Sequence, residues 1–275
     1  MCLILLACRS HPDFSLIVAA NRDEFFERPT LPAARWTDNS SVIGGRDLEK
    51  GGSWLAAACG GRLAAVTNFR DPHRPNGGTR SRGLLISDYV SHEQTPAAFL
   101  DGLQKQSDHY DGFNLIVADR GDAFHFSNIS NAVTALPPGV HGLSNHLLNT
   151  RWPKVERCKA AMTRLLTRSG ETLVDDLFAA LLDAEIPLDA DLPATGVSLD
   201  WERRLSTVFI TGSVYGTRAS TVVLIDYAGA VTLVERRFAP DGKPDGTTAL
   251  HLPAPSSATA ALEHPAHASM GNSRI

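Results

Sequence analysis

The chain has 275 residues, of which 43% are hydrophobic and 20% charged, so it is long enough to bury a substantial core as one large soluble domain. Its formal net charge of −4 gives no electrostatic reason to expect a nucleic-acid partner. It contains no run of about 20 apolar residues and no basic segment before its apolar start, so we expect no membrane span, no secretory leader and a cytoplasmic location.

The first 70 residues show the pattern of strands separated by turns, and they predict two hairpins. The turn signal at residues 11–13, His-Pro-Asp, separates two unbroken apolar runs. Gly60 and Gly61 separate two further runs, and both glycines tolerate the positive φ of a two-residue turn. The four strands are expected over residues 2–8, 15–20, 53–59 and 62–68.

Helical spacing begins after Gly83, where apolar residues recur three or four positions apart. The basic cluster of Arg70, His73, Arg74, Arg80 and Arg82 just before it is interpreted as a solvated loop. In chain order we then expect helices over residues 84–90 and 99–103, strands over 113–118, 123–127, 132–136 and 140–144, and helices over 152–168 and 171–182.

The last part of the chain returns to strands. Residues 183–200 are rich in Asp, Pro and Gly and predict a loop that could border a site, and apolar periodicity ends after Phe238. We therefore expect a single domain over residues 1–238 and a disordered tail over 239–275. Because most of the inferred pairings are hairpins, the fold class is α+β with two largely antiparallel sheets and helices outside them. The closing strands are expected over residues 206–210, 220–226 and 230–236.

Cys2 is the first candidate for chemistry. Removal of the initiator Met would leave a thiol and a free α-amine on one residue, and an amine with a pKa of about 8 can accept the proton of a thiol with a pKa near 8.5. This pairing is the basis of N-terminal nucleophile catalysis. The alternative is that Cys2 is a small hydrophobic residue on a buried strand. The four cysteines, at positions 2, 8, 59 and 158, are not closely spaced, so we expect neither a disulfide framework nor a metal site.

Four polar residues, Asn-Arg-Asp-Glu at positions 21–24, follow the second apolar run. The first hairpin would return this end of the strand toward Cys2, where Asp23 could hold and orient the α-ammonium. Asn21 and Arg22 are then candidates for substrate binding. The alternative is a solvated strand exit.

Three other polar residues stand at strand ends. Asn68 and Asn145 each follow an expected strand and are candidate oxyanion donors, because a neutral amide stabilises developing negative charge without neutralising the thiolate beforehand. Asn is also a common turn residue. Arg218 precedes an apolar strand and could lower the pKa of Cys2 or bind a substrate carboxylate, unless it is a surface residue. Trp54 is interpreted as core or pocket wall.

Several motifs, taken in order, resemble the NRDE family, also called the transport and Golgi organisation protein 2 family. The resemblance covers residues 1 to about 237 and rests on Met-Cys at positions 1–2, Ala-Asn-Arg-Asp-Glu-Phe at 20–25, Gly-Gly-Ser-Trp-Leu at 51–55, Thr-Asn-Phe at 67–69 and Tyr-Gly-Thr-Arg at 215–218. It implies a four-layer αββα sandwich of the N-terminal nucleophile (Ntn) hydrolase type, with an arrangement similar to penicillin V acylase and bile salt hydrolase.

That resemblance also implies roles for the site residues. It makes Cys2 the nucleophile, places Asp23 beside the α-amine, puts Asn68 and Asn145 near the oxyanion and puts Arg218 beside the thiol. One departure is Ala20, where those amide hydrolases have an arginine. Arg22 lies two residues further on and would point to the same face of the strand.

Two functions follow as expectations. The first is a cysteine hydrolase that acts on a linear amide or acyl substrate at a non-peptide C–N bond, forms an acyl-enzyme at Cys2 and needs no cofactor. The alternative is a non-catalytic trafficking protein for haem or a lipid-like ligand. Haem would then be held noncovalently, because the chain has no Cys-x-x-Cys-His attachment pattern. In both cases the expected partner is a small molecule.

Overall fold

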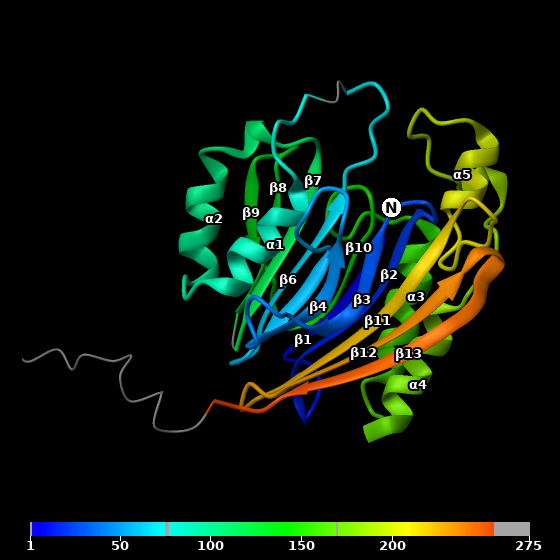
Figure 1. The fold of residues 1–275 in the computed structure, drawn as a ribbon. Helices are drawn as coiled ribbons and strands as arrows, with labels where there is room; N and C mark the ends of the chain where they lie inside the picture. The colour runs from blue at the N-terminus through cyan, green and yellow to red at the C-terminus, as the bar shows by residue number, and fades with distance from the viewer. Residues whose placement is uncertain (1, 75–76, 121, 169, 256–275) are drawn as a thin grey trace, which may run out of the picture.

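The computed structural model describes residues 2–74, 77–120, 122–168 and 170–255. Two antiparallel sheets face each other, and helices cover both outer faces, which gives the four layers of an αββα sandwich (Figure 1). This is the α+β, Ntn-hydrolase-like fold expected from the sequence. Within the described residues, no helix is both long enough and apolar enough to cross a membrane.

The first sheet carries the start of the chain. Its strands lie in the order β10-β1-β2-β11-β12-β13, and each neighbouring pair is antiparallel. The hairpin expected across residues 11–13 is confirmed, because β1 pairs with β2 along its whole length. The strand bounds are β1 Cys2–Cys8, β2 Phe14–Phe25, β10 Gly139–Leu143, β11 Tyr215–Asp226, β12 Val231–Ala239 and β13 Lys243–Leu252.

The second sheet is a continuous meander in the order β3-β4-β5-β6-β7-β8-β9. The expected hairpin at Gly60 and Gly61 joins β5 to β6, and both glycines have a positive φ, near 80°. The strand bounds are β3 Thr30–Arg35, β4 Val42–Asp47, β5 Leu55–Ala58, β6 Arg62–Asn68, β7 Phe113–Asp119, β8 Asp122–Ser127 and β9 Ala132–Ala135.

The helices divide between the two outer faces. Helices α1 and α2 pack on the second sheet, and α3 and α4 pack on the first (Figure 1). Pro occupies the start of α2 and of α3, where its missing N–H costs no helical hydrogen bond. The helix bounds are α1 Arg82–Ser91, α2 Pro96–Gln104, α3 Pro153–Leu165, α4 Gly170–Leu181 and α5 Leu199–Leu205, with short 3₁₀ turns at Ser107–His109, Asp189–Asp191 and Pro240–Gly242.

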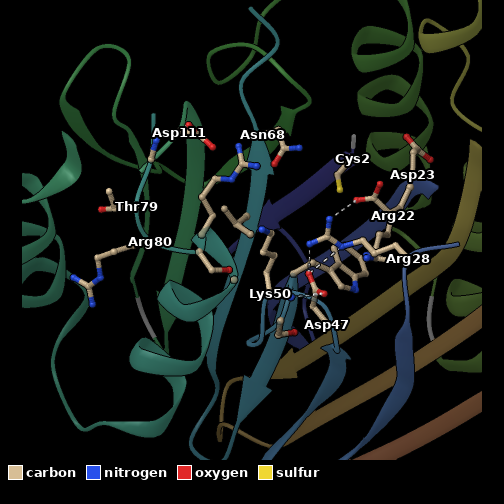
Figure 2. A pocket seen from close by; sticks show the side chains of 18 residues that line it. Cys2, Arg22, Asp23, Arg28, Asp47, Lys50, Asn68, Thr79, Arg80 and Asp111 are labelled. Atoms are coloured by element: carbon tan, nitrogen blue, oxygen red, sulfur yellow. Dashed lines mark hydrogen bonds and ion pairs between the residues drawn. The ribbon is translucent and has the colours of Figure 1, made fainter. Parts of the chain in front are cut away.

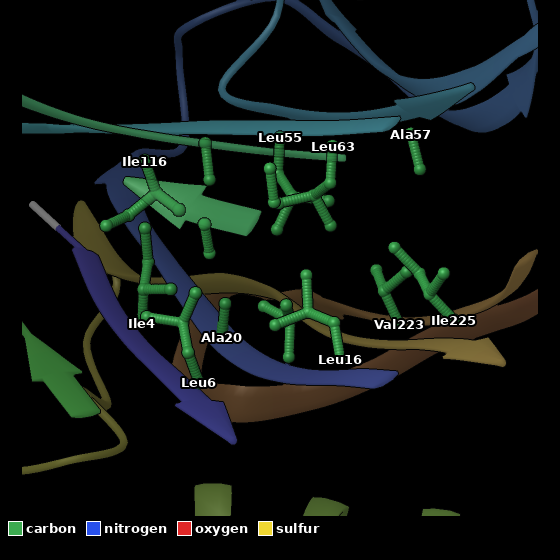
Figure 3. Close-up of a cluster of buried hydrophobic side chains, with 14 of the residues drawn as sticks. Ile4, Leu6, Leu16, Ala20, Leu55, Ala57, Leu63, Ile116, Val223 and Ile225 are labelled. Atoms are coloured by element: carbon green, nitrogen blue, oxygen red, sulfur yellow. The ribbon is translucent and has the colours of Figure 1, made fainter. Parts of the chain in front are cut away.

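Strand alternation explains why β1 and β2 read as unbroken apolar runs. Ile4 and Leu6 point between the two sheets, where they pack with residues of both (Figure 3). Leu3 and Leu5 point to the other face and pack under α3 and α4. Both faces of these strands are therefore buried, so no polar alternation appears in the sequence.

Several expectations need correction. The Asn-Arg-Asp-Glu block is not a solvated strand exit, because it lies inside β2, and Asn21, Arg22 and Asp23 are buried. Residues 206–210 form no strand; they follow α5, a helix that we had expected to be loop. The boundary at residue 238 is also misplaced, because Lys243–Leu252 form β13 and pair with β12. The remainder of the expected tail, residues 256–275, lies outside the described residues.

Candidate active site

Cys2 occupies the first position of β1, an interior strand of the first sheet. It belongs to the even-numbered residues of the strand, which face the second sheet, and it pairs in register with Arg22 on β2. Its carbonyl oxygen accepts a hydrogen bond from Ser144 Oγ at 3.1 Å. The side of the residue that is not held by the sheet opens into a cavity of about 240 Å³, and 8% of Cys2 is exposed.

This first cavity lies between the start of β1, the end of β6 and the beginning of α1. Figure 2 shows Cys2, Arg22 and Asp23 on one side of it, and Thr79 and Arg80 on the other. Half of its lining residues are charged, namely Arg22, Asp23, Glu24, Arg28, Asp47, Lys50, Arg80, Arg82 and Asp111, and the remainder are Cys2, Ser53, Trp54, Val66, Asn68, Gly78, Thr79, Ser81 and Gly83. A cavity of this composition suits a polar ligand.

Asp23 lines the cavity beside Cys2 and is almost completely buried. Its Oδ1 accepts a hydrogen bond from Thr217 Oγ1 at 2.7 Å. Burial raises the pKa of the carboxyl, while Lys154 and the Thr217 hydroxyl lower it. Burial in turn lowers the pKa of Lys154 to about 8, and Lys154 Nζ donates to the carbonyl oxygen of Leu205 at 2.7 Å. A carboxyl and an ammonium group are therefore buried together behind the start of β1.

The same surroundings act on the thiol. Burial raises the pKa of Cys2, and the charge of Asp23 raises it further, whereas Arg22 and the backbone amide of Asp23 lower it. Near neutral pH the sulfur is consequently protonated unless a base accepts its proton.

The two asparagines take different positions. Asn68 ends β6 and lines the cavity, and its side-chain amide has no hydrogen-bond partner among the described residues. Asn145 is fully buried and does not line the cavity. Its Nδ2 donates to the backbone oxygen of Asn68 at 2.9 Å, and its own carbonyl oxygen accepts from the backbone N of Arg70 at 2.7 Å. Asn145 therefore fixes the chain at Asn68, and only Asn68 presents its amide to the cavity.

Arg22 points to the side of the sheet on which Ala20 lies, as expected, and it lines the Cys2 cavity. Arg218 does not. A β-bulge between Thr217 and Ala219 shifts the register of β11, and Arg218 lines a second cavity of about 340 Å³ instead of the one that holds the thiol. Arg22 and Trp54 line both cavities, so the two spaces adjoin.

The side chain of Asn21 forms hydrogen bonds only with other parts of the protein interior. Its Nδ2 donates to the carbonyl oxygens of Leu181 and Val208, both at 2.9 Å, and its Oδ1 accepts from Ser220 at 2.6 Å. It therefore fastens β2 to the helical layer and lines neither cavity. The loop expected over residues 183–200 lines neither cavity.

Some residues of the site were missed. Arg80 and Arg82 belong to the basic cluster that we had interpreted as a solvated loop, yet both line the first cavity. The sequence contained a signal for these two residues, because a cluster of basic residues lies at the start of a helical pattern. Arg70, from the same cluster, is buried and forms an ion pair with Glu202 at 3.0 Å. No sequence signal distinguishes Lys154, which lies on α3.

Two facing sheets between helical layers, with a cysteine as second residue at the start of an interior strand and open to a cavity, define a protein with the Ntn-hydrolase-like fold. A family model described as Transport and Golgi organisation 2 matches residues 1–240, and the chain belongs to this family.

Curated relatives and solved structures are similar to the chain over most of its length. It is 34% identical over 256 residues to the Transport and Golgi organization protein 2 homolog of Bos taurus and 33% identical over 256 residues to that of Homo sapiens, in each case covering 86% of this chain and 92% of the relative. A Caenorhabditis elegans ortholog of N-acylethanolamine-hydrolyzing acid amidase has 12% identity and a TM-score of 0.42, covering 81% of this chain and 92% of that one. The C2A mutant of conjugated bile acid hydrolase from Clostridium perfringens has 11% identity and a TM-score of 0.46, covering 92% of each chain.

Proposed function

We propose that this protein is an N-terminal cysteine hydrolase that cleaves the C–N bond of a small, linear amide. The observation that carries the proposal is the position of Cys2. It stands at the start of an interior strand, its neighbour in register is Arg22, and it shares one cavity with Asp23 and Asn68.

The base would come from Cys2 itself. Because burial raises the pKa of the thiol, ionisation at neutral pH requires a nearby proton acceptor. Removal of Met1 would free the α-amine of Cys2, and that amine can accept the thiol proton directly or through a water molecule. In its ionised form, Asp23 would hold the resulting ammonium and keep it oriented.

The reaction then divides into two steps. The sulfur forms a bond to the substrate carbonyl carbon, the C–N bond breaks, and the ammonium returns its proton to the leaving amine, which leaves a thioester on Cys2. Water adds to the thioester, gives a proton to the α-amine, and releases the acid and the free thiol. In both steps the Asn68 amide would donate to the carbonyl oxygen as it becomes negative, an interaction that typically contributes about 3 kcal/mol to lowering the barrier.

The lining of the cavities does not fit haem. Among the described residues that line either cavity there is no His or Met, and Cys2 supplies the single thiol, so the usual axial ligands are missing apart from the proposed nucleophile itself. Half of the residues that line the first cavity are charged, which does not suit an apolar macrocycle or a lipid chain. The site therefore favours hydrolysis over transport of haem or a lipid-like ligand.

The test combines intact mass, thiol labelling and turnover. We expect intact-mass analysis to show loss of Met1 and a neutral iodoacetamide probe to label Cys2 first. Cys2→Ala should abolish that labelling and reduce hydrolysis of N-acyl amides by about 10³-fold or more. Cys59→Ser is the matched control, because Cys59 is a half-buried thiol next to Gly60 in the hairpin between β5 and β6 and lines neither cavity.

Two results would contradict the proposal. The first is a purified protein that retains Met1. The second is labelling confined to Cys59 or Cys158, the latter a thiol whose pKa burial raises to about 12.

A further inference from the structure

The second cavity is lined by a largely buried cation, Arg22, that forms no ion pair within the described residues. Arg22 is only 6% exposed, and within the described residues its guanidinium has no hydrogen-bond or ion-pair partner. A guanidinium in such a sparsely hydrated position favours an anionic partner, because it carries five N–H donors and a full charge. Arg22 faces the space that contains Arg218 on one side and Cys2 on the other.

Arg218 adds a second positive charge on the same wall. One of its terminal nitrogens, Nη1, donates to two backbone carbonyl oxygens, those of Phe25 and Arg28, which fix the guanidinium but do not neutralise it. Burial lowers the pKa of Arg218, and the positive charge of Arg22 lowers it further. The two guanidinium groups therefore repel each other across the cavity. Glu24 and Asp245 oppose this effect on the pKa of Arg218, but among the described residues no carboxylate lies within ion-pair distance of either guanidinium.

The other walls offset this charge only in part: Asp245 also lines the cavity and raises the pKa of Arg218, but it forms no ion pair with Arg218. Glu235 is a buried carboxyl of the cavity, and its Oε1 accepts a hydrogen bond from the backbone N of Ala33 at 2.8 Å. Burial raises its pKa, whereas the Ala33 hydrogen bond, Arg237 and Arg22 lower it. Arg237 lies 3.8 Å from Glu235 and donates to Thr248. Much of the remaining surface is apolar and comes from Leu31, Pro32, Trp54 and Phe238.

We propose that Arg22 and Arg218 bind an oxyanion end group, a carboxylate or a phosphate, of the molecule whose carbonyl carbon reaches Cys2. This assignment rests on the proposed hydrolase function and narrows its substrates to anionic amides. An apolar segment would lie along Trp54, the oxyanion would pair with the two guanidinium groups, and the scissile amide would lie in the first cavity. A guanidinium can hold either oxyanion through two parallel hydrogen bonds.

The test uses the full chain and two thiol reagents of matched length. The reagent 6-maleimidohexanoate carries a carboxylate, whereas N-hexylmaleimide ends in a methyl group. We expect Cys2 to react at least about tenfold faster with the carboxylate reagent than with the neutral one, a ratio that corresponds to about 1.4 kcal/mol. The ratio should fall as salt is added.

Substitutions test whether Arg218 causes the preference for the carboxylate reagent. In Arg218→Gln the ratio should fall toward one, and Arg218→Lys, which keeps the charge, should retain part of it. Arg236→Gln is the matched control, because Arg236 loses the same charge on the neighbouring strand but points away from this cavity and pairs with Asp175 at 2.6 Å. Equal rates for the two reagents in the unmodified chain would overturn the anion site and leave the proposed nucleophile intact.

A second measurement separates the two proposals and the two anions. Glutarate and inorganic phosphate are titrated into the Cys2→Ala protein by calorimetry, and at least one should bind with an affinity that Arg218→Gln weakens about tenfold. The anion that binds identifies the end group. If Cys2 reacts with neither maleimide, the hydrolase proposal fails and calorimetry alone decides on the cavity; absence of binding by both anions then overturns the anion site as well.

Discussion

Asp23 and Lys154 are two buried ionisable groups, and each changes the pKa of the other. Asp23 must be ionised to hold an ammonium group, yet burial raises its pKa. Lys154 opposes that rise, although burial has already lowered its own pKa to about 8. Each group therefore makes the ionised form of the other less unfavourable, and in the proposed hydrolase Lys154 would act through Asp23.

We predict that Lys154→Met moves the acid limb of the pH profile to higher pH. Without the ammonium the pKa of Asp23 rises further, so its carboxylate is lost at a higher pH as the solution is acidified. The measurement is the rate of Cys2 alkylation, or kcat/KM, between pH 4 and 9. Lys159→Met, on the same helix but paired with Glu156 at 3.5 Å, should leave the profile unchanged. Superimposable profiles for the two variants would show that Lys154 has no influence on Asp23.

The sequence predicted part of the lining of the first cavity. Cys2, Asp23 and Asn68 line the first cavity. They were selected from local features, namely the position of Cys2 after the initiator Met and the polar residues that follow apolar runs. Lys154 was not selected, because a lysine in a helical pattern is ordinarily solvated and its burial depends on α3 packing against the first sheet. A β-bulge moves Arg218 away from the first cavity, and no residue type at that position predicts the extra residue in β11.

Among the elements, the start of α1 is held against the segment before β5 by glycines. Gly52 has a φ of +79°, and a Cβ at this position would lie 2.2 Å from the carbonyl oxygen of Gly83. The backbone N of Ser53 donates to that same oxygen at 3.1 Å. This close approach places Ser81, Arg82 and Gly83 on the wall of the Cys2 cavity.

Gly52→Ala should therefore lower the free energy of unfolding by about 1–3 kcal/mol, because it combines an unfavourable φ with a backbone collision. Urea unfolding followed by tryptophan fluorescence measures the effect. Gly102→Ala is the control within α2, where a Cβ meets no atom within 4 Å. It should stabilise the protein by up to about 1 kcal/mol through helix propensity. Equal effects of the two substitutions would show that the close approach contributes nothing.

The sequence did not predict α5 or β3, because the secondary structure of both depends on tertiary contacts. Helix α5 is only seven residues long, and it is fixed by Glu202, whose Oε2 accepts from Arg70 and whose Oε1 accepts from Thr195. Strand β3 has an exposed pattern and a bulge, so it lacks an apolar signature. Long runs with a clear period, such as β1, β6 and β7, were placed correctly.

For the whole molecule, β13 closes the outer edge of the first sheet. It pairs with β12 over most of its length, and Leu252 is completely buried in the core between the sheets, with Leu250 packed against that core. Polar residues dominate the rest of the strand, which is why apolar periodicity ends after Phe238. The domain therefore extends beyond the expected boundary.

Two truncations test this extension. Removing all residues after 238 should cost several kcal/mol, because burial of each leucine contributes about 1.5–3 kcal/mol and β12 also loses its hydrogen-bonded neighbour. Removing only residues 256–275 keeps every contact described here and should leave the denaturation midpoint unchanged. Chemical denaturation of both forms beside the full chain decides the matter. If the shorter form were as stable as the full chain, β13 would contribute no stability.

The placement of Cys2 in a hydrogen-bonded ladder has a consequence for motion. Many reactive side chains sit on loops that sample several conformations within microseconds, and binding must then select among them. Here the backbone that carries the sulfur is clamped between β2 and the segment that follows β10, so it can be displaced only when those neighbours separate. Adaptation to differently shaped ligands must therefore come from the opposite wall, while the sulfur keeps a fixed position.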